Sequence, residues 1–186
     1  MNNIPSVDLA DFLSDDPSRK QKFVNEIGKA YEEIGFVSLK NHFLSDELVE
    51  DLYKEIKAFF ALPEETKKGY EIPGLGGQRG YVSFGKEHAK GKKEGDLKEF
   101  WHFGQEPSED ANLIDEYPDN VIVDELPDFN KTGMEAYRML EKTGIYVLRA
   151  LALYIGVDEH YFDHWATNGN SILRPIHYPP ITTEPK

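Results

Sequence analysis

The chain of 186 residues is 39% hydrophobic and 12% aromatic, enough for a packed domain, and it has no cysteine for disulfides, cysteine-type zinc sites or thiol nucleophiles. Its formal net charge of −13 excludes nucleic acid and anionic membrane surfaces as main partners, because both attract basic proteins. No apolar run approaches the ~20 residues of a membrane span and no signal-peptide pattern opens the sequence, so we expect a cytoplasmic protein.

Short strands alternate with amphipathic helices in the first third of the sequence. Apolar residues recur every second position in the strands and every three to four positions in the helices. Ser18 and Gln21 form a capping box, and Gly35 supplies a helix end. In chain order, these patterns predict a strand over residues 4–9, a helix from Ser18 to Gly35, a strand over 36–39, a helix from Ser45 and a helical turn from Pro63.

The middle of the sequence predicts a long loop and then a long helix. Residues 74–95 hold many glycines and charges with little periodicity, which indicates an ordered loop. Its glycines at 74–77 lack the lysine and hydroxyl of a phosphate-binding loop, so a turn is favoured there. After a strand over 98–103, apolar residues keep helical spacing over 127–155 and Gly156 ends the helix. At 1.5 Å per residue, this helix is roughly 40 Å long.

The last segment, residues 172–180, has the pattern of a strand that runs into a proline turn, and the sequence stops six residues later. A strand in a core needs partners for its backbone groups. We therefore expect residues 171–186 to be the opening strand of a truncated sheet. An unpaired edge favours low stability or self-association.

Two histidines, His160 and His164, give the tightest candidate metal cluster. Their spacing of i and i+4 places them on one helical face, with Asp163 beside the second. No third ligand lies nearby in the sequence. We therefore favour the alternative, a short helix whose aromatic residues pack inward; these are Tyr161, Phe162 and Trp165.

Arg174 and Tyr178 are a candidate ligand pair. They lie four residues apart, which places both on the same face of one strand. An arginine fork and a phenol hydroxyl suit a small carboxylate. The alternative is a buried structural pair.

Several sequence blocks carry a resemblance in their order and spacing. They are IPSVDL at 4–9, GFVSLKNH at 35–42, FALPEETK at 60–67, RGY at 79–81, DLKEF at 96–100, Leu173-Arg174 and Tyr178-Pro179-Pro180. Together they resemble the N-terminal half of the isopenicillin N synthase family, the non-haem iron(II) and 2-oxoglutarate-dependent oxygenases. The resemblance covers residues 1–186 as an N-terminal dioxygenase region.

The resemblance implies an α+β fold with a helical N-terminal layer, a long central helix and an incomplete double-stranded β-helix, or jelly roll. In the family, a His-x-Asp pair and a distant histidine hold iron(II), and an Arg-x-Ser pair fixes 2-oxoglutarate. None of these motifs occurs in this sequence. We therefore expect no metal ligands or catalytic residues in the chain, and no tight binding of iron(II) or 2-oxoglutarate by the chain alone.

The resemblance also implies roles for individual residues. Tyr178 matches the tyrosine near the 2-oxoglutarate carboxylate, although Ile176 stands where the family often has asparagine. The loop with Arg79, Tyr81 and Phe84 is expected to border the substrate pocket, and Arg174 joins these as a candidate pocket residue.

These observations leave different classes of function open. The favoured one is the N-terminal part of an oxidoreductase, a dioxygenase that uses iron(II) and 2-oxoglutarate on a small-molecule substrate and is inactive without its iron-ligand segment. The alternative is a non-catalytic folded protein that self-associates through its unfinished sheet and binds a partner. A metal centre at His160 and His164 is a third hypothesis. Whether the chain alone is an enzyme stays open.

Overall fold

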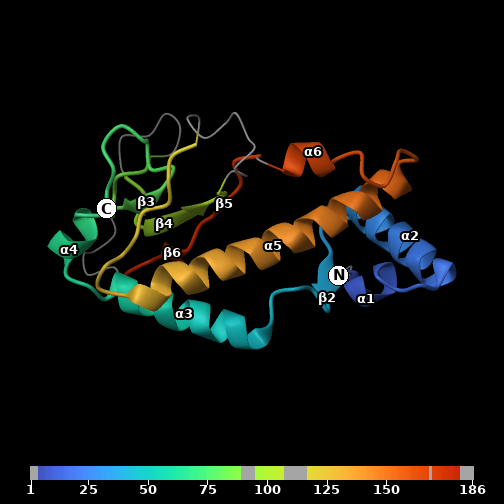
Figure 1. Ribbon diagram of the computed structural model, residues 1–186, viewed down its shortest axis with the longest axis horizontal. Coiled ribbons are helices and arrows are strands. Elements are labelled where there is room, and N and C mark those ends of the chain that lie inside the picture. Colours follow the sequence, from blue (N-terminus) through green and yellow to red (C-terminus); the bar gives the residue numbers. More distant parts are fainter. Residues whose placement is uncertain (1–3, 89–94, 107–116, 168, 181–186) are drawn as a thin grey trace. The chain divides into compact units, whose positions relative to one another are not determined.

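A computed structural model describes residues 4–88, 95–106, 117–167 and 169–180 (Figure 1). The chain divides into two compact units. The first unit comprises Met1–Asp46 and Arg138–Thr167, and the second comprises Glu47–Tyr137 and Asn168–Lys186. The long helix α5 (Pro127–Tyr154) contributes to both. Over the described ranges, no helix combines the length and the apolar character that a membrane crossing requires.

The first unit is mainly helical. Its strand β1 (Ser6–Asp8) pairs in parallel with β2 (Ser38–Lys40), and the second half of α5 belongs to it. Three further helices complete it: α1 (Leu9–Phe12), α2 (Pro17–Glu33) and α6 (Asp163–Ala166). Gly28 on α2 allows a close approach to α5, because a Cβ there would lie 2.1 Å from the Tyr154 ring. The buried core is Val7, Leu9, Phe12, Phe23, Val24, Ile27 and Ala150.

The second unit is built on strand β4 (Glu99–Gly104), which is buried along its whole length. Strands β3 (Gly80–Val82), β5 (Ile172–Leu173) and β6 (Ile176–His177) all pair antiparallel with it. Between β5 and β6, the carbonyl of Pro175 accepts a hydrogen bond from the Trp101 amide at 3.0 Å. Helices α3 (Asp46–Phe60) and α4 (Glu64–Lys68) precede the sheet in the chain.

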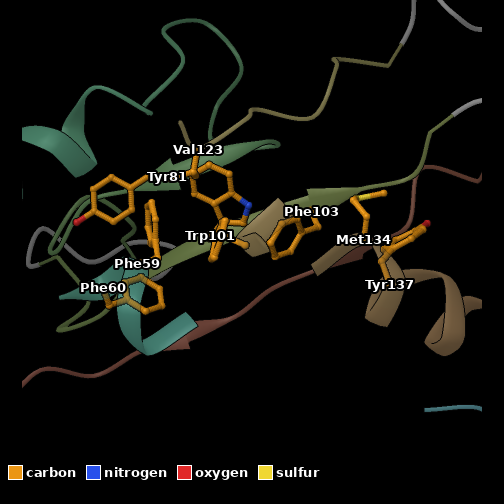
Figure 2. Close-up of a cluster of buried hydrophobic side chains, with 9 residues drawn as sticks. Phe59, Phe60, Tyr81, Trp101, Phe103, Val123, Met134 and Tyr137 are labelled. Carbon is orange, nitrogen blue, oxygen red and sulfur yellow. The ribbon is translucent and has the colours of Figure 1, made fainter. Parts of the chain in front are cut away.

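Aromatic rings dominate the core of the second unit (Figure 2). Trp101 has its ring centroid 4.9 Å from Phe59 and 5.1 Å from Phe129, both in edge-to-face geometry. Gly133 allows α5 to pack closely against this core, since a Cβ there would lie 2.2 Å from the Phe103 ring. The remaining buried members are Phe60, Tyr81, Val123, Met134 and Tyr137.

The structure confirms the α+β fold and most predicted elements. The long helix begins at Pro127, and α4 follows Pro63, as the sequence pattern predicts. The prediction of a loop over 74–95 is wrong at β3, which forms by pairing with the distant β4. Residues 89–94 of that loop, and 181–186 of the expected opening strand, lie outside the described residues.

Two predicted boundaries are also wrong. The first long helix is capped by Asp16, whose side chain accepts a hydrogen bond from the Ser18 amide at 2.8 Å, so the predicted capping box does not start it. Residues 172–180 form two short strands, β5 and β6, because Pro175 cannot donate a ladder hydrogen bond.

Candidate functional site

The second unit contains a cavity of about 370 Å³ beside β3 and β4. Phe100 and His102 line it from β4, and Arg174 lines it from the connection between β5 and β6. The glycine-rich turn after Glu71 forms another wall, with Gly74, Gly76 and Gly77 all at positive φ. Successive side chains of β4 point to opposite faces of the sheet, so one buried strand can contribute residues both to the aromatic core and to the cavity.

The protonation of His102 follows from its partners. Arg174 Nε lies 2.5 Å from His102 Nε2, and an arginine can only donate, so Nε2 accepts. The proton of the neutral ring therefore sits on Nδ1, which donates to the Gly77 carbonyl at 2.5 Å. Burial, reinforced by the Arg174 charge, lowers the pKa of His102 from 6.5 to about 4. His102 is therefore neutral at pH 7.

Arg174 is held on several sides. Besides its bond to His102, its guanidinium carbon lies 4.3 Å from the Phe100 ring centroid. Its Nη1 has a longer contact of 3.4 Å with Glu87 Oε1. Glu87 pairs more closely with Lys98, at 2.6 Å, and this bond lowers the pKa of Glu87. Among the residues that the structure describes, none hydrogen-bonds Nη2 of Arg174.

A second polar cluster lies around the buried carboxylate of Glu99, and we call it the Glu99 cluster. Lys67 Nζ and His177 Nδ1 each lie 2.7 Å from the carboxylate, and the Tyr81 hydroxyl donates to it. Burial acts to raise the pKa of Glu99, but these three hydrogen bonds outweigh it and lower the pKa. Burial and the hydrogen bond to Glu99 raise the pKa of Tyr81.

Arg79 is fully buried and lies outside the cavity lining. It donates to the Gln78 carbonyl at 2.8 Å and to Asn170 Oδ1 at 3.0 Å. No carboxylate pairs with it in the described part of the chain, and burial lowers its pKa. Gly104 makes room for it, since a Cβ there would lie 1.7 Å from the guanidinium carbon.

The structure brings together only part of the set of candidate residues. Tyr81 and Arg174 both line the cavity. Phe84 is 47% exposed and Tyr178 is 67% exposed, and neither lines it. Arg174 and Tyr178 do not share one strand, because β6 lies between them.

Sequence reasoning missed His102 and Glu87 as cavity residues. The alternation on strand 98–103 contained a signal for His102, because it places this residue on the same face as Phe100. Glu87 had no such signal, since it lies in a loop and reaches Arg174 across 87 positions of sequence.

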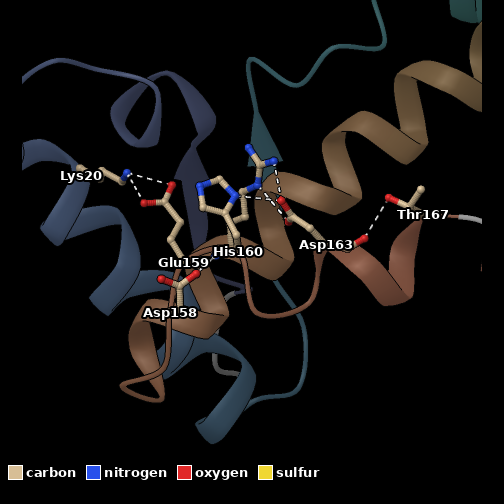
Figure 3. A network of polar contacts seen from close by, with 7 residues as sticks. Lys20, Asp158, Glu159, His160, Asp163 and Thr167 are labelled. Carbon is tan, nitrogen blue, oxygen red and sulfur yellow. Dashed lines mark hydrogen bonds and ion pairs between the residues drawn. The ribbon is translucent and has the colours of Figure 1, made fainter.

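The candidate metal cluster is an ion-pair network (Figure 3). His160 Nδ1 lies 2.8 Å from Asp163, and Asp163 pairs with Arg149 at 2.7 Å. The Arg149 hydrogen bond lowers the pKa of Asp163 to about 2. His164 has its ring 4.4 Å from that of Trp165. Within the described ranges, no group of three or more His, Cys, Asp or Glu residues has an arrangement that could hold a metal ion.

The prediction that the aromatic residues beside this cluster pack inward is wrong for two of them. Tyr161 is 46% exposed and Trp165 is 57% exposed. Helix α6 has only four residues, too few to bury one face against a neighbour, and the rings of Tyr161 and Trp165 pack against each other with centroids 5.3 Å apart.

Comparisons with known proteins agree on one class. A family model described as non-haem dioxygenase in morphine synthesis N-terminal matches residues 4–125. The proline hydroxylase buaE of Petromyces alliaceus is 30% identical over 186 residues, which cover 96% of this chain and 56% of that protein. The 2-oxoglutarate-Fe(II) type oxidoreductase hxnY of Emericella nidulans is 28% identical, over 94% of this chain and 52% of that protein.

Solved structures give the same result. A 2OG-Fe(II) oxygenase family protein from Caulobacter crescentus matches with a TM-score of 0.84 and 36% identity, over 99% of this chain and 59% of that chain. A full-length Neurospora crassa protein solved in complex with alpha-KG matches with a TM-score of 0.77 and 29% identity, over 96% of this chain and 54% of that chain. The chain thus spans a little over half the length of these relatives.

The described residues do not fit the iron site of such enzymes. The sequence contains no His-x-Asp motif. The described residues hold no cluster of three potential ligands. What the second unit does offer is a cavity with a fixed guanidinium and an apolar wall.

Proposed function

The chain belongs to the isopenicillin N synthase-like family of 2-oxoglutarate- and iron(II)-dependent oxygenases, and we propose that it is the N-terminal part of one that oxidises a small molecule. In this proposal the second unit forms one wall of the substrate pocket. The iron ligands come from outside the described residues, and residues 171–186 open the catalytic sheet.

The cavity beside β4 carries this proposal. Its volume of about 370 Å³ lies within the roughly 300–1,000 Å³ typical of small-molecule sites. Relatives act on or bind molecules of this size: one is a proline hydroxylase, and the N. crassa protein has also been solved with alpha-KG and thymine. We assign Tyr81 and Arg174 to the pocket, with Arg79 supporting the sheet behind it and the exposed Phe84 ring at its border.

Tyr178 is the proposed contact to 2-oxoglutarate. Tyr178 is 67% exposed, so the residue is open to a ligand. We expect Tyr178→Phe in the active enzyme to raise the KM for 2-oxoglutarate several-fold, because the ring is kept and one hydrogen bond is lost. A KM unchanged for 2-oxoglutarate would contradict the assignment.

The decisive experiment uses the protein from its native source, captured with an antibody against this chain. We expect release of succinate from 2-oxoglutarate that requires iron(II) and oxygen, together with an intact mass above 21.3 kDa. Absence of iron-dependent succinate release over a panel of small substrates would contradict the proposal. Cell fractionation of the same source tests the predicted cytoplasmic location.

The alternative function, a self-associating protein without catalysis, is favoured by the exposure of apolar residues on two strands. Ile172 on β5 is 38% exposed, and Ile176 on β6 is 41% exposed. Sedimentation velocity at several concentrations tests it. A defined oligomer from a native protein of 21.3 kDa would support the alternative.

A further inference from the structure

We propose that the cavity beside β4 binds a small carboxylic acid, with the carboxylate on Arg174 and an apolar body against Phe100 and Val82. This inference deepens the proposed function by naming its substrate class, and its binding part stands on the geometry of this chain alone.

The hydrogen-bonding inventory of the cavity favours an anion. The acidic groups at its edge already have cationic partners: Glu71 pairs with Lys86, and Glu87 with Lys98. The two nitrogens of His102 are both engaged. The strong donor left without a described partner is Nη2 of Arg174.

The guanidinium is oriented before any ligand arrives. His102 accepts the hydrogen bond from Nε, and the guanidinium carbon lies over the Phe100 ring. The edge formed by Nη1 and Nη2 is therefore left for a ligand. A carboxylate can bind this edge through two parallel hydrogen bonds. Among the described residues, Glu87 is the carboxylate that forms an ion pair with Arg174, and its contact of 3.4 Å is long enough for a ligand to replace.

The remaining lining restricts the rest of the ligand. Ile72, Pro73, Val82 and Phe100 present apolar surface. A second charge on the ligand would meet this surface without a partner, which is costly. An acid with one carboxylate and an apolar body therefore fits better than a dicarboxylate such as 2-oxoglutarate.

His102 is a positioning residue for Arg174. In its neutral form it accepts the Nε proton, whereas a doubly protonated imidazolium has no acceptor to offer. The groups that face His102 are Arg174, Arg79, Glu87 and the Gly77 carbonyl. We expect acid binding to weaken as His102 becomes protonated in acidic solution.

The experiment measures binding by titration calorimetry at pH 7, with 3-phenylpropanoate, its neutral amide and 2-oxoglutarate as probes. We expect the acid to bind at least 10-fold more tightly than the amide and more tightly than 2-oxoglutarate. Equal affinities for acid and amide, or tighter binding of 2-oxoglutarate, would overturn the inference.

Two variants act in opposite directions, so misfolding cannot imitate the result. Arg174→Gln should abolish the preference for the acid, whereas Glu87→Gln should strengthen acid binding several-fold because it removes the competing carboxylate. Arg19→Gln, in the first unit, is the control and should change nothing. A preference that persists in Arg174→Gln, or acid binding that weakens in Glu87→Gln, would contradict the role of Arg174.

The readouts also separate this inference from the proposed function. Equal binding of acid and amide with intact succinate release by the native protein would overturn the inference alone. Preference for the acid without succinate release would contradict the oxygenase proposal and leave carboxylate recognition supported.

Discussion

Glu99→Gln should destabilise the second unit more than any surface substitution. The Glu99 side chain is 6% exposed and that of its partner Lys67 is 9% exposed, with 2.7 Å between the charged atoms. Glutamine keeps the size of the side chain and one acceptor oxygen. It removes the negative charge, however, and leaves the Lys67 ammonium buried beside an amide.

The magnitude follows from this burial. Breaking a buried ion pair by removing one partner costs about 3–5 kcal/mol, because the other charge stays desolvated. Tyr81 and His177 also donate to this carboxylate, and an amide offers one oxygen where the carboxylate offers two. Since folded domains have unfolding free energies of roughly 5–15 kcal/mol, the loss is a large fraction of the total.

Urea unfolding followed by tryptophan fluorescence measures the effect. The background should carry Trp165→Phe, so that Trp101 in the core of the second unit is the remaining reporter. With an m-value of about 2 kcal/mol/M, the midpoint should fall by roughly 1.5–2.5 M. The control Glu65→Gln, at a side chain 89% exposed, should stay within about 0.5 kcal/mol of the parent.

The reasoning also predicts a partial rescue. If the unpaired ammonium is the cause, Lys67→Met in the Glu99→Gln background should recover part of the lost stability. A loss below about 1 kcal/mol for Glu99→Gln, or a double variant less stable than the single one, would refute this account of the Glu99 cluster.

Further predictions concern His102 and two glycines, one of them close-packed and the other in open space. The folded-state pKa of His102 lies near 4, whereas its ordinary value is 6.5. The neutral ring therefore makes its full contribution to the free energy of unfolding above pH 6.5, and this contribution is lost as the pH falls to about 4. His102→Gln should remove up to about 3 kcal/mol of this pH dependence in urea melts, and an unchanged slope would contradict it. Gly104→Ala should cost about 1–3 kcal/mol, because its Cβ meets the Arg79 guanidinium. Gly144→Ala, in open space on α5, should instead stabilise the chain by roughly 0.5–1 kcal/mol. If both glycine substitutions stabilised the chain, or both destabilised it, the packing explanation would be contradicted.

The helices could be predicted because their signals are local. Apolar spacing over 127–155 and a glycine at 156 define α5, and Gly156 does adopt a positive φ of 79°. Strand β3 could not be predicted in this way. It has three residues, and Gly80 within it has a φ of 74° and a Cβ position only 2.6 Å from the Tyr70 carbonyl. Its pairing with β4 joins residues about twenty positions apart, which local pattern does not reveal.

Only some residues of the candidate site could be predicted from the sequence. Arg174 stood out as a charged residue in an apolar strand pattern, but its partner His102 lies 72 positions away. The prediction of a shared face with Tyr178 assumed one continuous strand. Pro175 breaks that strand into β5 and β6, and the two residues then have separate surroundings.

The two faces of β4 explain why stability and recognition can be tested separately. Glu99 and Trp101 belong to the Glu99 cluster and the aromatic core, whereas Phe100 and His102 line the cavity and hold Arg174. A free arginine side chain loses about 2 kcal/mol of rotamer entropy when a ligand orders it. Here folding has already ordered it, so a carboxylate that reaches Arg174 gains its hydrogen bonds with little further loss. Loosening the guanidinium through His102 should therefore weaken acid binding even though every cavity-facing donor remains present.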